Sequence, residues 1–293
     1  MIDFGNIITA MVTPFDTKGD VDYQKALELA NYLIDHGTDT ILLAGTTGES
    51  PTLTHNEEYQ LFKYIKSEIG TKALIMAGTG SNCTRTAIEA TKKAEDCKID
   101  SVLHVAPYYN KPSQDGLFQH FSTIAKETKL PIMLYNIPGR SCINIDVSTI
   151  KKLSIEKNIV GIKEASGSIE IVKELKAMLP NSFQIYSGDD ALTLPCLEHG
   201  AKGVVSVASH CIGIQLQEMV SFYHQNDFVE AKKIHQKLQS LFKILFITSN
   251  PVPVKAALRH MGMNVGSVRL PLVDVTKNED EAIKKVLLSL ELI

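Results

Sequence analysis

The run TILLAG at residues 40–45 is apolar at nearly every position, and the runs ALIMAG at 73–78 and PIMLYNI at 131–137 share this character. A strand with one face in water alternates apolar and polar residues, whereas a strand buried on both faces reads as a continuous apolar segment. These runs therefore predict parallel strands that are covered on both faces.

Eight such runs follow one another along the chain, at residues 7–13, 40–45, 73–79, 101–107, 131–137, 159–163, 183–187 and 203–208. Their starts lie 20 to 33 residues apart, close to the roughly 30 residues of a strand–helix–strand unit. Eight units predict an α/β protein, a (β/α)8 TIM barrel. The alternative is an open doubly wound sheet, but the third glycine of its dinucleotide-binding fingerprint is missing after Gly78-Thr79-Gly80.

Helical patterns fill the intervals between the runs. Ala26 and Leu33 lie on one helical face before Gly37, which suits a helix C-terminus. Thr54 and Glu57 form a capping box at the start of the next helix. We therefore expect a crossover helix between successive strands.

The strand signal stops after residue 226. Helical patterns follow at residues 227–247, 252–261 and 278–290, separated by Asn250-Pro251 and Gly262. We therefore expect a barrel domain over residues 1–226, which carries the active site, and a C-terminal helical appendage over residues 227–293.

The composition excludes several classes of protein. Of the 293 residues 44% are hydrophobic, and 30 basic against 33 acidic residues give a net charge of −3. We therefore expect neither a nucleic-acid partner nor a membrane span. The N-terminus has no signal-peptide pattern, and five widely spaced cysteines without a CxxC pair favour a cytoplasmic protein over a disulfide framework.

Lys163 is the residue that most strongly predicts chemistry, because it is the last residue of the run 159–163 and follows four apolar residues. The C-terminal ends of the strands form the active site in such barrels. Burial disfavours the charged form of a lone ammonium, and a neutral amine is a nucleophile toward carbonyl carbon. The alternative is a structural lysine that pairs with Glu164 or another carboxylate.

Polar side chains at other strand ends fit a Schiff-base mechanism, which has to move protons. Tyr135 ends the preceding strand, and Thr46 and Tyr109 are candidates to extend the proton relay. The glycine-flanked turn that contains Thr46 and Thr47 suits a small carboxylate. Arg140 follows Tyr135, and its planar guanidinium suits a substrate carboxylate, although a surface arginine is the alternative.

Other reaction types find no support in the sequence. The nine histidines include no HExxH motif, so we expect no metal ion. Neither a G-x-S-x-G motif nor a Walker P-loop is present. Asp189-Asp190 after the seventh run argues against the phosphate site that many barrels carry there.

Taken in order, the motifs resemble the dihydrodipicolinate synthase (4-hydroxy-tetrahydrodipicolinate synthase) family of pyruvate-dependent class I aldolases, a superfamily that also contains N-acetylneuraminate lyase. The resemblance runs over the whole chain. It is carried by ITAMVTPF at 8–15, GTTGES at 45–50, APYYNKP at 106–112, YNIPGRS at 135–141, GIKEASG at 161–167 and SGDD at 187–190.

The resemblance implies a lyase that condenses pyruvate with L-aspartate 4-semialdehyde in lysine and diaminopimelate biosynthesis, without a separate cofactor. It implies a Schiff base of pyruvate on Lys163 and a proton relay of Thr46, Tyr135 and Tyr109, the last of which reaches into a neighbouring subunit. It also implies a homotetramer built as a dimer of dimers.

The same resemblance implies where the substrates bind. Thr46, Thr47 and Gly188 line the pyruvate pocket, with Val205 near the lysine, and Arg140 binds the carboxylate of the semialdehyde. The sequence GRS after YNIP favours the synthase branch over the alternative of an N-acetylneuraminate or keto-sugar-acid lyase. A barrel without activity that serves as a ligand sensor is a further alternative, which predicts a broken site, and none of the matched positions is broken.

A regulatory site is also implied. In family members that lysine inhibits, the effector-binding positions match Ser50, His55, Asn82 and Tyr108. Those members carry a histidine and a glutamate where this chain has Glu58 and Thr86. We therefore expect weak or absent inhibition by lysine; the alternative is that Glu58 partly substitutes for the missing carboxylate.

Overall fold

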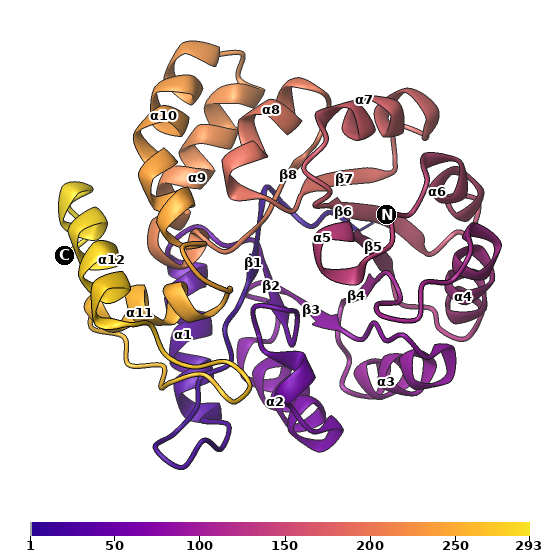
Figure 1. Ribbon diagram of the computed structural model, residues 1–293. Coiled ribbons are helices and arrows are strands. Elements are labelled where there is room, and N and C mark those ends of the chain that lie inside the picture. Colours follow the sequence, from indigo (N-terminus) through magenta and orange to yellow (C-terminus); the bar gives the residue numbers. More distant parts are fainter. Residues whose placement is uncertain (1) are drawn as a thin grey trace.

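The eight predicted strands form one closed barrel. The computed structural model describes residues 2–293, and its strands are parallel and follow one another around the barrel in chain order (Figure 1). They are β1 (Ile7–Ala10), β2 (Thr40–Leu43), β3 (Leu74–Gly78), β4 (Ser101–Val105), β5 (Ile132–Asn136), β6 (Ile159–Glu164), β7 (Gln184–Ser187) and β8 (Gly203–Ser206). The TIM barrel is confirmed, and only β6 extends beyond its predicted run, by Glu164.

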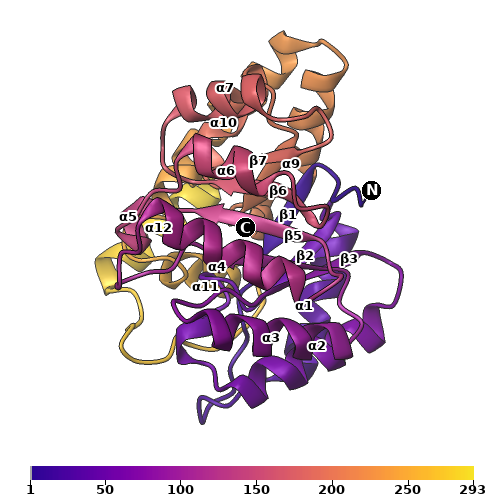
Figure 2. The same cartoon turned by 90° about the vertical axis from the view of Figure 1, so that its right-hand side faces the viewer.

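Helices surround the barrel on its outside. They are α1 (Tyr23–Asp35), α2 (His55–Ile69), α3 (Thr84–Asp96), α4 (Gln114–Lys126), α5 (Pro138–Ser141), α6 (Val147–Leu153), α7 (Ile169–Met178), α8 (Thr193–Glu198) and α9 (Ser209–His224), with short 3-10 turns η1 (Ser50–Thr52) and η2 (Asp190–Leu192). The predicted capping box of Thr54 and Glu57 is present at the start of α2. Figure 2 shows α3, α4, α6 and α7 packed in succession along one side.

The barrel interior is a packed apolar layer. Side chains alternate between the two faces of a strand, so every second residue points inward. The buried inner cluster consists of Phe4, Ile8, Ala10, Leu42, Met76, Leu103, Met133, Tyr135, Val160, Tyr186 and Val205. Large side chains fill this space, which leaves the reactive groups at the C-terminal ends of the strands.

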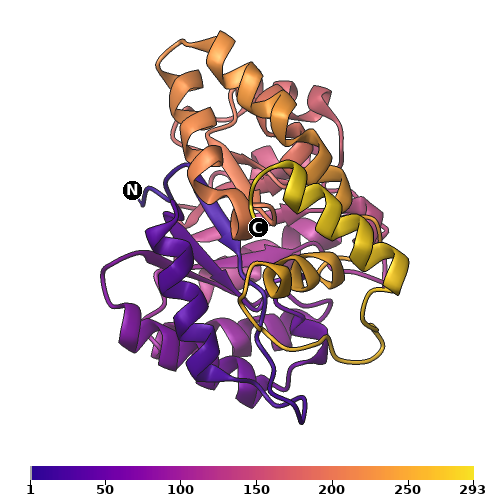
Figure 3. The same cartoon turned by 90° about the vertical axis from the view of Figure 1, so that its left-hand side faces the viewer.

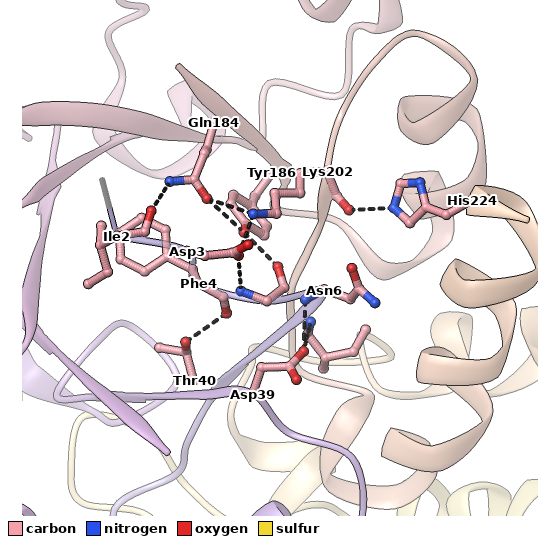
Figure 4. A network of polar contacts seen from close by, with 12 residues as sticks. Ile2, Asp3, Phe4, Asn6, Asp39, Thr40, Gln184, Tyr186, Lys202 and His224 are labelled. Atoms are coloured by element: carbon pink, nitrogen blue, oxygen red, sulfur yellow. Dashed lines mark hydrogen bonds and ion pairs between the residues drawn. The ribbon is translucent and has the colours of Figure 1, made fainter. Parts of the chain in front are cut away.

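The N-terminal segment closes the opposite end of the barrel (Figure 4). The ring of Phe4 is fully buried and meets Tyr186 edge to face at 6.3 Å. The Tyr186 hydroxyl donates to the carbonyl of Gly5 at 2.6 Å, and the Gln184 side-chain amide donates to the carbonyl of Ile2 at 2.8 Å. Residues 2–6 therefore seal the end of the barrel away from the candidate site.

Charged side chains hold this segment in place. Lys202 pairs with Asp3 and donates to Gln184 Oε1 at 3.2 Å. Asp39 Oδ2 accepts the backbone N–H groups of Asn6 at 2.7 Å and Ile7 at 2.9 Å. The carboxylate thus satisfies backbone donors that enter the first strand.

The three predicted helices of the C-terminal region are confirmed as α10 (Phe228–Ile244), α11 (Val252–His260) and α12 (Lys277–Ser289). They lie along one side of the barrel (Figure 3), with α10 packed on α9. Phe242 and Leu258 belong to the same buried cluster as the barrel helices. The domain boundary at residue 226 stays a prediction. Within residues 2–293, no helix has the length and apolar character that a membrane span needs.

Candidate active site

Lys163 points into the barrel from β6. Its side chain is only 6% exposed, and it lies in register between Tyr135 on β5 and Tyr186 on β7. The Lys163 Nζ atom lies 4.2 Å from the centroid of the Tyr135 ring. The structure therefore brings together the predicted nucleophile and the predicted phenol.

Glu164 is not the partner of Lys163, so the alternative of a pair between these two residues is wrong. Strand alternation directs Glu164 to the other face. Its carboxylate accepts the Asn136 side-chain amide at 2.9 Å and the Ser166 backbone N–H at 2.6 Å. Burial raises the pKa of Glu164, and these hydrogen bonds oppose that rise. Within residues 2–293, none of the ion pairs includes Lys163.

Gly188 makes room for the lysine side chain. A Cβ atom at this position would lie 2.6 Å from Ala165 Cβ and 3.0 Å from Lys163 Cε. The Gly188 backbone N–H donates to the carbonyl of Glu164 at 2.7 Å, which fixes this close approach. The predicted pocket residue Gly188 is therefore in contact with Lys163.

A cavity of about 430 Å³ opens at the C-terminal ends of the strands. Its lining includes Thr46 after β2, Tyr135 at the end of β5 and the exposed Arg140 on α5. The structure thus places these three predicted residues around one cavity. Four others, Lys163, Thr47, Gly188 and Val205, lie outside the lining, and all but Gly188 are buried.

Tyr109 does not join the other candidate relay residues. Its side chain is 88% exposed, and its backbone has a φ of +76°, in the left-handed region. Its neighbour Tyr108 lines the cavity instead. In the single chain, Tyr109 therefore projects into solvent.

The loop from Gly45 to Ser50 is held by the C-terminal region. The Asn250 side-chain amide donates to Thr47 Oγ1 at 2.9 Å, and Lys255 on α11 pairs with Glu49 at 2.6 Å. Burial lowers the pKa of Lys255 to about 8, against the opposing effect of Glu49. Sequence reasoning missed both contacts, although a single lysine within the apolar run 252–258 was an available signal.

The backbone after β8, where many barrels bind phosphate, is already occupied by Asp190. Its carboxylate accepts the N–H groups of Val207 at 3.0 Å and Ala208 at 2.9 Å, and the hydroxyl of Ser206 at 2.5 Å. Burial raises the pKa of Asp190, and these donors counter the rise. An anionic phosphate would meet a carboxylate there. Residues 2–293 also contain no cluster of three side chains suited to a metal ion.

Comparison with known proteins identifies the family. The model of the dihydrodipicolinate synthetase family matches residues 3–290. The chain belongs to the dihydrodipicolinate synthetase family. A 4-hydroxy-tetrahydrodipicolinate synthase from Desulforamulus reducens is 53% identical over 293 residues, which cover 100% of this chain and 99% of the relative.

Solved structures of the dihydrodipicolinate synthetase family agree with the fold. The dihydrodipicolinate synthase of Bacillus anthracis is 50% identical and superimposes with a TM-score of 0.97 over 99% of each chain. The enzyme of Cyanidioschyzon merolae, solved with lysine bound, is 48% identical, again with a TM-score of 0.97 over 99% of each chain.

In this member of the dihydrodipicolinate synthetase family, three of the four positions predicted for a lysine site line the same cavity. Ser50, His55 and Tyr108 line it, and Asn82 donates to the Tyr108 carbonyl at 3.2 Å. Glu58 accepts a hydrogen bond from Ser50 at 2.7 Å and lies 3.3 Å from His55 Nδ1. Burial raises the pKa of Glu58, and these two partners counter the rise. The Glu58 carboxylate therefore already has partners within the chain, Ser50 and His55.

Proposed function

We propose that the chain condenses pyruvate with L-aspartate 4-semialdehyde through an imine between pyruvate and Lys163. The protein is a lyase of the class I aldolase type with 4-hydroxy-tetrahydrodipicolinate synthase activity, an activity of lysine and diaminopimelate biosynthesis, because full-length relatives of about 50% identity carry that name. We therefore retain this interpretation over the sugar-acid lyase alternative. One observation carries the mechanism: Lys163 is buried beside Tyr135 without a carboxylate partner.

The first half of the reaction activates pyruvate. The Lys163 amine attacks the keto carbon and forms a carbinolamine, whose hydroxyl leaves as water once it is protonated. Tyr135 supplies that proton, with Thr46 as the next member of the relay. Loss of a proton from the methyl carbon then converts the imine into an enamine.

The second half forms the new carbon–carbon bond. The enamine carbon attacks the aldehyde carbon of the semialdehyde, and the resulting alkoxide takes a proton. The amino group of the former semialdehyde then attacks the imine carbon, and the Lys163 amine leaves. This step closes the ring and returns the free lysine, so the reaction needs no separate cofactor.

The two carboxylates bind at different places. Thr46 and Thr47 hold the pyruvate carboxylate with hydroxyl and backbone N–H donors, while Gly188 and Val205 shape the space beside Lys163. Arg140 lines the same cavity from the exposed side and binds the carboxylate of the semialdehyde.

The working protein is a cytoplasmic homotetramer built as a dimer of dimers. The observation that supports an oligomer is Tyr109, a large aromatic side chain that is 88% exposed with a left-handed backbone. Non-glycine residues rarely adopt this conformation without a structural reason. In the assembly, this tyrosine completes the proton relay of a neighbouring subunit.

Trapping the imine tests the mechanism directly. The folded protein is incubated with pyruvate, the imine is reduced with borohydride, and the modified residue is located by intact mass spectrometry and peptide mapping. We expect one adduct per chain, on Lys163. Lys255 provides an internal control, because it is a second buried lysine that this proposal leaves unmodified. Folded protein without an adduct, or with an adduct on another lysine, contradicts the proposal.

A further inference from the structure

Glu49 adopts a backbone conformation that has to be held. It lies in the loop that contains Thr46 and Thr47, is 2% exposed and has a φ of +55°. A left-handed conformation is unfavourable for a residue with a side chain, and it persists where surrounding contacts determine it. The contacts of Glu49 therefore decide the shape of this loop.

Both carboxylate oxygens of Glu49 are bound by the C-terminal region. Lys255 Nζ lies 2.6 Å from Oε1, and the backbone N–H of Arg269 donates to Oε2 at 2.9 Å. Lys255 is in turn fixed, because its Nζ donates to the carbonyl of Ser267 at 2.9 Å and lies 4.1 Å from the centroid of the Phe15 ring. The carboxylate thus has a single defined position.

A gain in protein stability does not explain why Glu49 and Lys255 form a buried ion pair. The side chains of Lys255 and Glu49 are 0% and 1% exposed. Removing two charges from water is so unfavourable that apolar residues of similar volume often stabilise a protein as well or better. An ion pair in such a place is better explained by the geometry that it fixes.

The ion pair of Glu49 and Lys255 fixes the turn that contains Thr46 and Thr47, where pyruvate binds in the proposed reaction. The backbone N–H of Glu49 donates to the carbonyl of Thr46 at 3.1 Å. A second hydrogen bond connects the C-terminal region to this turn, because the Asn250 side-chain amide donates to Thr47 Oγ1 at 2.9 Å. Because Thr47 Oγ1 accepts a hydrogen bond from Asn250, the O–H of Thr47 is left to donate a hydrogen bond elsewhere.

We propose that the buried pair of Glu49 and Lys255 is a positioning device, through which the C-terminal region orients Thr46 and Thr47 toward the carboxylate of pyruvate. This inference rests on the proposed function, because it takes pyruvate as the molecule bound there. Glu49 and Lys255 are positioning residues, since they act on the substrate through the loop. The C-terminal helices thereby contribute to substrate affinity without contacting the substrate.

The test separates positioning from stability with three variants. Lys255→Met leaves a buried carboxylate without its partner, Glu49→Gln keeps an acceptor for Arg269, and the double variant removes both charges. We expect the double variant to recover the melting temperature lost by Lys255→Met. We also expect its KM for pyruvate to stay raised by about tenfold to a hundredfold, as small misplacements of binding groups produce, while its KM for the semialdehyde is unchanged.

Asp280→Asn is the matched control. It removes a contact between α11, which also carries Lys255, and α12: His260 Nε2 lies 2.9 Å from Asp280 Oδ1. Among residues 2–293, neither His260 nor Asp280 forms a side-chain hydrogen bond or ion pair with the Gly45–Ser50 loop. We expect a wild-type KM for pyruvate in this variant, together with a wild-type rate of imine trapping.

Two outcomes overturn the inference in distinguishable ways. If the double variant recovers its melting temperature and its KM for pyruvate together, the pair serves stability only. If Lys255→Met and the double variant do not fold, Glu49→Gln decides, and a wild-type KM for pyruvate in that variant overturns the inference. Wild-type protein that forms no pyruvate adduct overturns the proposed function as well.

Discussion

A Cβ atom on Gly188 would lie 3.0 Å from Cε and 3.1 Å from Cγ of Lys163. The lysine side chain therefore occupies the space that a side chain at position 188 would need. The absence of a side chain at Gly188 therefore allows the observed position of Lys163, the nucleophile of the proposed reaction, and this leads to the first prediction.

Gly188→Ala will slow the formation of the pyruvate imine. The added methyl group meets Ala165 Cβ at 2.6 Å and forces the Lys163 side chain to move. Misplacement of a reacting group commonly lowers the rate by about a hundredfold. The rate of borohydride-trapped adduct formation measures the effect. Gly139→Ala is the control, because nothing lies within 4 Å of its new methyl group; equal slowing in both variants would contradict the prediction.

Arg140→Ala will impair use of the semialdehyde and spare pyruvate. Loss of a hydrogen bond to a charged group costs about 1.5–3 kcal/mol, which is about tenfold to a hundredfold in affinity. Steady-state kinetics with each substrate varied in turn measure the split. Arg140→Lys keeps the charge but loses the planar fork, so we expect an intermediate effect. A selective loss of pyruvate binding would reverse the two substrate roles.

Lysine will inhibit this protein weakly or not at all. Thr86 offers no carboxylate to an ammonium group, and the Glu58 carboxylate is already bound by Ser50 and lies beside His55. Titration of activity with lysine measures the effect, and half-inhibition at submillimolar lysine would falsify this expectation. The double variant Glu58→His with Thr86→Glu should gain sensitivity, because it restores the residue types of lysine-sensitive family members.

Acid will destabilise the folded chain through buried neutral histidines. Burial lowers the pKa of His104 to about 3 and the pKa values of His120 and His210 to about 4, from 6.5. Below pH 6.5 the unfolded chain binds protons that the folded chain does not, so stability is present above this pH and is lost as the pH falls toward 4.

His210→Gln isolates one of these contributions. His210 Nε2 accepts the Val12 backbone N–H at 3.1 Å, and glutamine keeps an acceptor there but does not titrate. From about pH 7.5 to about pH 5.5, wild type should lose about 1.4 kcal/mol more free energy of unfolding than the variant does. Denaturant unfolding at the two pH values measures this difference, and parallel losses would show that His210 is not responsible.

The fold and the burial of Lys163 at the end of a strand could be predicted from local sequence. Continuous apolar runs at a regular period predict the strands, and Lys163 ends one of them, at the end of the barrel where such folds carry their active sites. Alternation alone does not assign its face, because β6 contains a register shift that places Val160 inside the barrel and Ile162 outside. The pairing of Glu49 with Lys255 could not be predicted in this way. The two residues are separated by most of the barrel in sequence, and only the packing of α11 brings them together.

The surroundings of two other candidate residues, Tyr109 and Glu164, do not follow from the residues next to them in sequence. Tyr109 matches a family motif, but its side chain points into solvent, so the relay role that we propose for it requires a neighbouring subunit. Glu164 is adjacent to Lys163 in sequence and is therefore a candidate partner. Strand alternation separates them, which was available as an argument from the sequence itself.

The contacts of residues 2–6 with Gln184 and Tyr186 have a consequence for access to Lys163. Because the buried Phe4 ring occupies the far end of the barrel, small molecules reach the lysine from the C-terminal ends of the strands, where the cavity opens. In the proposed reaction, both substrates enter and both water and product leave through this one face of the barrel.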